Sequence, residues 1–131
     1  MLTPERQVNF DTVRSIGLAL PDVEESTAYA MPALKIRGKL LATLPANRSA
    51  EPNSLVVRVS FEERAELLAA DPTVYYLTEH YEGYDSVLVR LARVSPEALK
   101  GLLAMAHKYV TRKPARASAS RRLRPRAARA G

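Results

Sequence analysis

The stretch VYYLTEHYEGYDSVLVRL, residues 74–91, decides how the chain closes into a fold. It holds four of the six tyrosines in the sequence, together with one of the two histidines, His80. Its second half, SVLVRL, is rich in β-branched and aliphatic residues and predicts a strand. A turn is expected between the two halves, around Glu82 and Gly83. The stretch therefore predicts a tyrosine-rich connection that leads into a strand.

The tyrosine cluster has two alternative roles. Aromatic side chains bury large areas while they keep a hydroxyl at the rim, which suits a segment packed over a sheet. They also stack on exposed bases, and each stack contributes ~1–3 kcal/mol. We expect the packing role, in which the cluster closes the fold. A separate alternative is a small-molecule binder or enzyme, with a possible pocket near Tyr75, His80, Tyr81 and Tyr84.

The segments before this stretch predict a hairpin, a strand and a helix. Residues 33–37 and 39–44 predict a hairpin that turns at Gly38, and residues 55–60 predict a central strand after a polar loop. Ser60 and Glu63 have the spacing of a capping box. The helix that they begin is expected to end at Asp71 and Pro72.

The ends of the folded region predict two further helices. Thr3 and Pro4 suit the start of a first helix, which is expected to end before Pro21, and residues 21–27 read as a polar loop. Ser95 begins the last helix, whose apolar stripe extends to Val110. The order helix, hairpin, strand, helix, strand, helix predicts an α+β fold, with an antiparallel sheet and helices packed on one face.

The composition is that of an ordinary globular domain. The chain has 131 residues, of which 47% are hydrophobic, and it has no cysteine, so disulfides and thiolate chemistry are excluded. Its apolar runs are shorter than the roughly 18 residues that predict a membrane span. The N-terminal residues show no basic region followed by an apolar one, so we expect no secretory signal, a cytoplasmic location and no membrane partner.

The net charge of +6 is distributed unevenly. Residues 1–110 contain 12 Lys and Arg against 14 Asp and Glu, whereas residues 111–131 contain 8 Lys and Arg and no acid. The last segment consists almost entirely of Ala, Arg, Pro and Ser, which cannot bury enough apolar surface to fold. We therefore predict an α+β domain over residues 1–113 and a disordered basic tail over residues 114–131.

The sequence resembles the MmcQ/YjbR family over residues 8–110. The resemblance is carried by LPDVEEST after the first helix, IRGKLLATL in the hairpin, DPTVYYLTEHYEGYDSVLVRL, and VSPEALKGLLAMAHKYV at the end. It implies a CyaY-like α+β fold, an antiparallel sheet with helices against one side. Members of the family are usually labelled DNA-binding, and the resemblance assigns no catalytic residue by position. The Arg/Ala tail lies outside the family pattern.

Alternation along the predicted strands places cations on one face of the sheet. The outward positions include Lys35, Arg37, Arg58 and Arg90, interspersed with Leu41, Val56 and Leu88. The cations could contact phosphates, or they could simply keep an exposed face soluble. The apolar members could instead serve a protein-interaction module, which is an alternative function for the chain.

The basic tail is the second candidate for polyanion binding. Arginine dominates it, and arginine contacts phosphates in a bidentate manner without reading base sequence. An alternative is that a GC-rich genome produces the same Ala and Arg content by drift. The favoured function is weak, non-sequence-specific binding of DNA or another polyanion, through the sheet face and through Arg112, Lys113, Arg116, Arg121, Arg122, Arg124, Arg126 and Arg129.

An enzyme is the minority interpretation. His80 and His107 are the only histidines, and His80 with Glu82 and Asp85 makes a weak metal signal, because too few ligand side chains gather there. Neither GxxxxGK[ST] nor GxGxxG occurs, so nucleotide phosphate loops are absent. We expect no catalytic residue, no metal and no cofactor.

Overall fold

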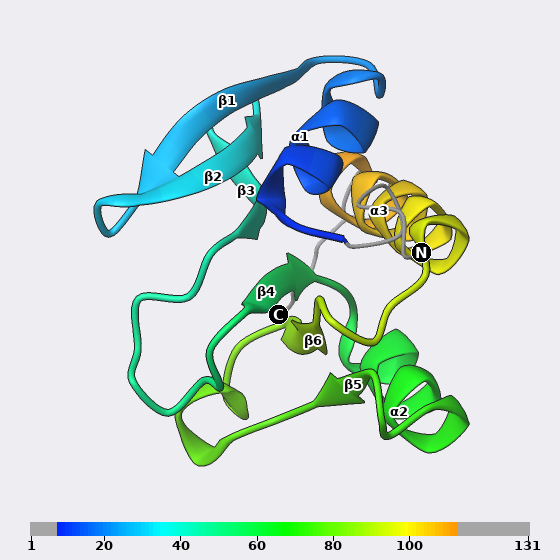
Figure 1. Cartoon of the computed structure of the whole chain (residues 1–131). Coiled ribbons are helices and arrows are strands. Elements are labelled where there is room, and N and C mark those ends of the chain that lie inside the picture. Colours follow the sequence, from blue (N-terminus) through cyan, green and yellow to red (C-terminus); the bar gives the residue numbers. More distant parts are fainter. Residues whose placement is uncertain (1–7, 113–131) are drawn as a thin grey trace, which may run out of the picture.

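Six strands form one antiparallel sheet in the order β1-β2-β3-β4-β6-β5 (Figure 1). The computed structural model describes residues 8–112. The strands are β1 (Val23–Ala28), β2 (Met31–Ile36), β3 (Lys39–Thr43), β4 (Ser54–Arg58), β5 (Tyr75–Tyr76) and β6 (Ser86–Arg90). The helices are α1 (Phe10–Leu18), α2 (Phe61–Ala70) and α3 (Pro96–Thr111), and a short 3₁₀ turn, η2, covers Glu79–Tyr81.

The three α-helices pack on one face of the sheet, which gives the predicted α+β architecture (Figure 1). The core between the two layers is built from alternate strand residues and from the apolar stripe of α3. Its fully buried members include Leu34, Val57, Val89 and Leu103. The long β3–β4 and β5–β6 connections lie on the other side of the sheet, to the left in this view (Figure 1). We call that side the outer face.

The helix caps confirm two of the three predicted helix starts. Ser60 caps α2 and forms the predicted capping box with Glu63, and Ser95 caps α3. Thr3 and Pro4, the predicted start of the first helix, lie outside the described residues; within them Asn9 has an extended backbone and caps a helix that begins at Phe10. The Asn9 side chain accepts a hydrogen bond from the backbone of Thr12, so the local capping chemistry lies further along the chain than predicted.

Strand β1 corrects the prediction of a polar loop after the first helix. Its sequence, VEESTA, pairs along its length with β2, from Val23 opposite Ile36 to Ala28 opposite Met31. Most of its residues are exposed, since it is an edge strand with no apolar face. A strand that buries neither face leaves no alternating pattern in the sequence.

The β2–β3 pairing corrects the predicted outward facing of Leu41. Leu34 pairs with Ala42 and Lys35 with Leu40, so the register shifts by one residue and Leu41 is left without a partner. This bulge turns Leu41 into the core, where it is fully buried, and leaves Leu40 on the outer face. Strict alternation places the two leucines the other way round.

Two tight turns join the first three strands. Arg37 and Gly38 connect β2 to β3 with positive φ angles of 50° and 84°, and Tyr29 and Ala30 connect β1 to β2 with angles of 52° and 69°. Positive φ at both central residues is the pattern of a type I′ hairpin turn. Neither Tyr29 nor Ala30 favours this conformation, so the first turn holds its tyrosine outward at a conformational cost.

The outer face is partly covered, which overturns the predicted exposed apolar face. Val56, Leu88 and Tyr81 form a second, smaller core, against which Ala50, Tyr76 and Leu77 pack. Leu41, Val56 and Leu88 have exposed fractions of 0%, 5% and 0%, so an interaction module that uses these three side chains is wrong. The tyrosine segment covers this face, as predicted for the packing role.

Two further predictions concern membrane spans and the C-terminal tail. None of the helices within residues 8–112 combines the length and the hydropathy needed to cross a membrane. The predicted domain boundary at residue 113 and the predicted tail, residues 114–131, lie outside the described residues.

Candidate functional site

A pocket of about 460 Å³ opens on the outer face of the sheet, and we call it the outer pocket. Three segments surround it: the end of the β1–β2 hairpin, the start of the β3–β4 connection, and residues 80–86 after β5. Its lining residues are Ala28, Tyr29, Leu40, Thr43, Leu44, Ala46, Asn47, Val56, Arg58, His80, Tyr81, Tyr84, Asp85 and Ser86. A volume of this size accommodates a small organic molecule.

The pocket has a buried apolar floor and an exposed aromatic rim. Val56 and Tyr81 belong to the floor, with exposed fractions of 5% and 8%. Tyr29 and Tyr84 form the rim, with exposed fractions of 91% and 58%. The His80 ring lies against Tyr81, with centroids 4.8 Å apart in an edge-on arrangement, and 5.9 Å from the ring of Tyr84.

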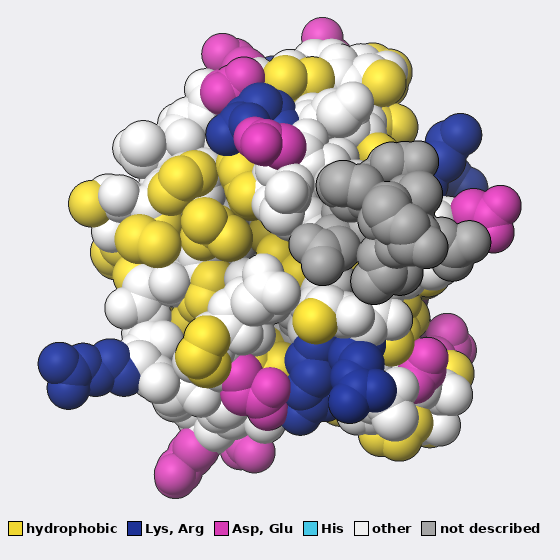
Figure 2. Space-filling model, viewed as in Figure 1, with side chains coloured by type: hydrophobic (Ala, Val, Ile, Leu, Met, Phe, Trp, Pro, Cys, Tyr) yellow, Lys and Arg dark blue, Asp and Glu magenta, His cyan; other side chains and the backbone are white. Residues whose placement is uncertain are grey.

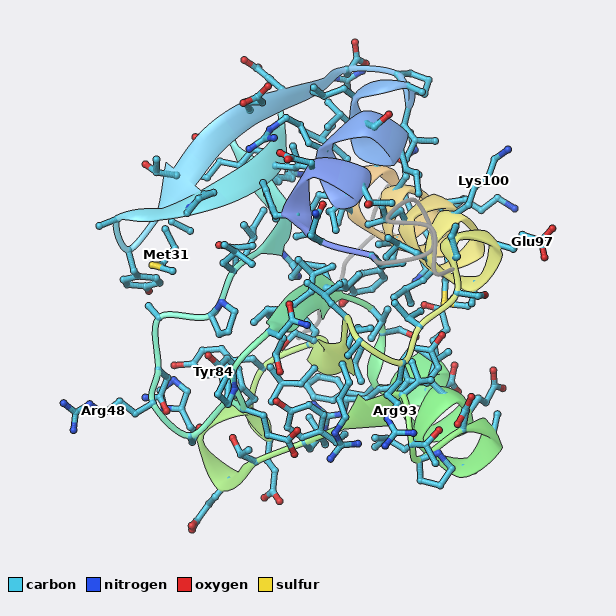
Figure 3. All side chains as sticks on the ribbon, in the orientation of Figure 1. Met31, Arg48, Tyr84, Arg93, Glu97 and Lys100 are labelled. Atoms are coloured by element: carbon cyan, nitrogen blue, oxygen red, sulfur yellow. The ribbon has the colours of Figure 1, made fainter. Side chains whose placement is uncertain are left out.

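Figures 2 and 3 show where the apolar rim of the pocket lies on the molecule. Hydrophobic side chains gather at the left of the molecule, over the end of the β1–β2 hairpin and beside the β3–β4 connection (Figure 2). Tyr84 lies at the left of the molecule, near the β3–β4 connection, while Arg48 points away from the surface (Figure 3). Large apolar side chains that stay exposed on a folded domain commonly mark a binding site.

Arg64 of α2 holds the tyrosine segment in place. Its guanidinium donates hydrogen bonds to the backbone carbonyls of Tyr84 at 2.7 Å, Glu82 at 3.1 Å and Ser86 at 3.2 Å. A longer contact of 3.5 Å reaches the carbonyl of Tyr81. One side chain thus satisfies several carbonyls of a segment that has little regular structure, and it fixes where the rim tyrosine stands.

Tyr76 of β5 fastens the end of the β3–β4 connection, outside the lining of the outer pocket. Its hydroxyl lies 2.6 Å from Ser54 Oγ and accepts a hydrogen bond from the backbone N–H of Glu51 at 2.8 Å. Ser49 and Thr78 add a second side-chain hydrogen bond of 2.7 Å between the β3–β4 connection and the residues after β5. These contacts fasten the two connections to each other across the outer face.

Arg58, Asp85 and Tyr109 form a connected polar group at one end of the pocket. Asp85 Oδ2 accepts hydrogen bonds from Arg58 Nη2 at 2.8 Å and from the Tyr109 hydroxyl at 2.7 Å. The Arg58 guanidinium also lies over the Tyr109 ring, 5.7 Å from its centroid. Burial, followed by the hydrogen bond to Asp85, raises the pKa of Tyr109 above its usual value, so the hydroxyl keeps its proton at neutral pH.

Three of the four cations predicted on the sheet face are paired with carboxylates. Arg58 contacts Asp85, Arg90 contacts Glu51 through two hydrogen bonds, and Arg37 lies 2.6 Å from Asp22. The hydrogen bond from Arg90 lowers the pKa of Glu51, and the same bond raises the pKa of Arg90. Their charges are therefore largely balanced within the protein.

The other predicted phosphate contacts are divided between described and undescribed residues. Lys35 lies across from Glu24 in the β1–β2 pairing. Arg112 ends α3, with its guanidinium 5.3 Å from the Tyr109 ring centroid. The remaining predicted contacts lie outside the described residues: Lys113, Arg116, Arg121, Arg122, Arg124, Arg126 and Arg129.

The predicted pocket residues are mostly brought together. His80, Tyr81 and Tyr84 line the outer pocket, but Tyr75 does not, because β5 turns its side chain into the helix-side core. Burial raises the pKa of both Tyr75 and Tyr81. The prediction missed Tyr29 as a rim residue, since the strand that leads to it was not foreseen.

The two histidines lie in different surroundings. His107 Nε2 lies 2.8 Å from the carbonyl oxygen of Pro21 and joins α3 to the turn before β1. His80 packs against tyrosine rings. Within residues 8–112 no three His, Asp or Glu side chains gather closely enough to form a metal site.

Comparison with known proteins identifies the family. A crystal structure from Deinococcus radiodurans, described as a DUF419 domain, superposes with a TM-score of 0.66 and 25% identity, over 86% of this chain and 84% of that one. Proteins named uncharacterized from Mycobacterium tuberculosis and Mycobacterium bovis are 46% identical over 48 residues. The match spans only 37% of the length of these curated relatives. The YjbR family model matches residues 18–109, so the chain belongs to the YjbR family, in agreement with the resemblance in its sequence.

Proposed function

We propose that the domain is a binding module whose outer pocket takes a small, flat, mainly apolar molecule with one polar end. The observation that carries this proposal is the combination of the exposed rim tyrosines, Tyr29 and Tyr84, with a buried apolar floor and a charged pair, Arg58 and Asp85. Ligand pockets are typically apolar with a few placed polar groups that orient the ligand.

Two further features support the proposal. The rim segment is held by Arg64, and the Ser49–Thr78 hydrogen bond ties the β3–β4 connection to the residues after β5, which limits the ordering that binding requires. Tyr29 occupies a strained positive-φ position and is almost fully exposed, which gives it no packing role of its own. Strained, exposed residues concentrate at functional sites.

The proposal is for binding without catalysis. The polar end pairs a guanidinium with a carboxylate that already accepts two hydrogen bonds, and a base engaged in this way is poorly placed to remove a proton from a ligand. The histidines contact a carbonyl and aromatic rings rather than a serine or threonine hydroxyl. The cytoplasmic location predicted from the sequence remains part of the proposal.

The test is to fill the pocket and measure binding. Ala46 lines the pocket and is exposed, so Ala46→Phe adds a ring inside the pocket without disturbing the core. Ala104 of α3 is also exposed and lies outside the pocket lining, which makes Ala104→Phe the matched control. In a panel of aromatic fragments followed by amide chemical shifts, fragments that bind the native chain should lose binding to Ala46→Phe only. Fragments that bind both variants equally would place their site elsewhere.

We also propose that the basic C-terminal segment binds DNA or another polyanion without sequence specificity. The supporting observation is that residues 111–131 hold 8 Lys and Arg and no acid, whereas the cations of the sheet face are largely paired with carboxylates. The segment, not the sheet face, is therefore the favoured phosphate contact. Cationic segments release condensed counterions from DNA, which makes the affinity depend strongly on salt.

A salt titration separates this activity from the pocket. If four or five phosphates are contacted, log K should fall with log salt concentration at a slope of about −4. A chain that ends at Lys113 should lose nearly all affinity for duplex DNA, while Ala46→Phe should keep it. Equal slopes for the full and the shortened chains would remove the segment from the interface.

A further inference from the structure

We propose that the ligand of the outer pocket is a neutral nucleobase-like ring with a lactam edge, a carbonyl next to an N–H, such as hypoxanthine, guanine or uracil. This inference rests on the proposed binding function and specifies its ligand. It follows from the charges at the polar end of the pocket, from their unused hydrogen-bonding groups, and from the aromatic rim.

The charges at the polar end favour a neutral ligand. Arg58 and Asp85 both line the pocket, and their contact of 2.8 Å forms one cation–anion pair. A ligand with net charge would approach one partner of like sign at the same time as one of opposite sign. A neutral group that offers an acceptor to Arg58 and a donor to Asp85 uses both partners.

The hydrogen-bonding groups of the pair are only partly used. Both hydrogen bonds that Asp85 accepts within residues 8–112 end on Oδ2, so Oδ1 accepts none from this part of the chain. Arg58 uses Nη2 for Asp85 and makes a long contact of 3.4 Å from Nη1 to the carbonyl of Leu40. Arg58 Nε is buried without a partner among the described residues, so the donors that remain for a ligand are the other N–H groups on Nη1 and Nη2. A lactam supplies the matching acceptor and donor side by side.

The rest of the pocket fits a planar ring. Tyr84 presents an exposed ring next to this polar end, and the lining there includes the apolar side chains of Leu40 and Val56. Every base has a π face that stacks on an aromatic side chain. A base held at its lactam edge by the pair could thus lie against Tyr84 while its body covers the apolar floor.

The test compares inosine with 1-methylinosine on the full chain. The methyl group replaces the N–H that would donate to Asp85, and it leaves the carbonyl, the ring and the ribose in place. Loss of a hydrogen bond to a carboxylate should weaken binding by roughly tenfold or more. Inosine should shift the amide resonances of residues 80–86, and equal affinities for the two nucleosides would overturn the inference.

A pair of variants locates the contact. Asp85→Asn keeps the shape of the side chain and removes its charge, so the affinity for inosine should fall by roughly tenfold. Glu51→Gln makes the same change in the Arg90 pair, outside the pocket lining, and should bind inosine like the native chain. Native affinity in Asp85→Asn would overturn the inference. If Asp85→Asn fails to fold, the comparison of the two nucleosides still decides.

Two outcomes distinguish this inference from the proposed function. Fragments that bind in the pocket while inosine does not would refute the lactam ligand and leave the binding module unaffected.

An inosine-containing trinucleotide identifies the source of the base. Trinucleotide affinity equal to that of inosine indicates a free nucleoside, and a tighter, salt-dependent affinity indicates a base within a strand.

Discussion

Replacing Arg64 should loosen the rim of the pocket and lower the stability of the fold. Arg64 is the one described side chain that joins α2 to the carbonyls of residues 82–86, so Arg64→Met removes these hydrogen bonds while it keeps much of the side-chain volume. The methionine can still pack on the Phe61 ring, over which the guanidinium now lies at 4.8 Å. The variant therefore isolates the hydrogen bonds from the packing.

The expected loss is about 2–3 kcal/mol. Three of the contacts, to Glu82, Tyr84 and Ser86, are 3.2 Å or shorter, whereas the contact of 3.5 Å to Tyr81 is too long to count. A hydrogen bond from a charged donor contributes about 1.5–3 kcal/mol when shielded. The carbonyls near the surface regain water when Arg64 is removed, so the loss is less than the sum of three such bonds. Arg64→Lys offers one compact ammonium and should recover about half of the loss.

Urea unfolding and amide hydrogen exchange measure the effect. Arg64→Met should lower the free energy of unfolding with an unchanged slope, and the amides of residues 81–86 should exchange faster than in the native chain. Arg93→Met is the matched control, because Arg93 is exposed and makes no side-chain hydrogen bond or ion pair within the described residues. A loss below about 0.5 kcal/mol, or unchanged exchange at Tyr84, would refute the positioning role.

Three further predictions follow from individual contacts. Ala30→Gly should stabilise the protein by about 0.5–1 kcal/mol in urea unfolding, because glycine tolerates the positive φ angle of 69°; destabilisation would contradict the turn geometry. Tyr76→Phe should cost about 1–2 kcal/mol, since it strands the buried Ser54 hydroxyl, and a neutral result would mean that water replaces the tyrosine. The raised tyrosine pKa values mean that the folded state holds these phenolic protons more tightly than the unfolded state. The tyrosine contribution to stability should therefore be constant below about pH 10, and stability should fall above it, less steeply in Tyr109→Phe.

The parts of the fold that local chemistry specifies were predictable from the sequence. The capping box of Ser60 and Glu63 lies within one helical turn, so it identifies the start of α2 without knowledge of any distant residue. The β4 and β6 strands are apolar on both faces, because helices cover one side and the tyrosine segment the other. A strand that is buried on both faces appears in the sequence as a continuous run of β-branched and aliphatic residues, which is why these two strands were predictable.

The missed parts depend on partners that are distant in the sequence. β1 exposes most of its side chains and is specified by its pairing with β2, which no periodic pattern records. The bulge at Leu41 is a register shift between two strands, so alternation along one strand cannot reveal it. Arg58 and Asp85 are 27 positions apart in the sequence, so their pairing leaves no local pattern. The sequence therefore predicts Arg58 as an unpaired cation and does not predict the polar end of the pocket.

The most direct test of the central claim is to locate a bound aromatic amide, such as benzamide, by intermolecular nuclear Overhauser effects on the full chain. The structure predicts contacts from the ligand ring to the Tyr81 and Tyr84 rings and to the Val56 methyl groups, all in the outer pocket. Contacts confined to other surfaces, or a saturable ligand that leaves these three residues untouched, would contradict the assignment of the outer pocket as the binding site.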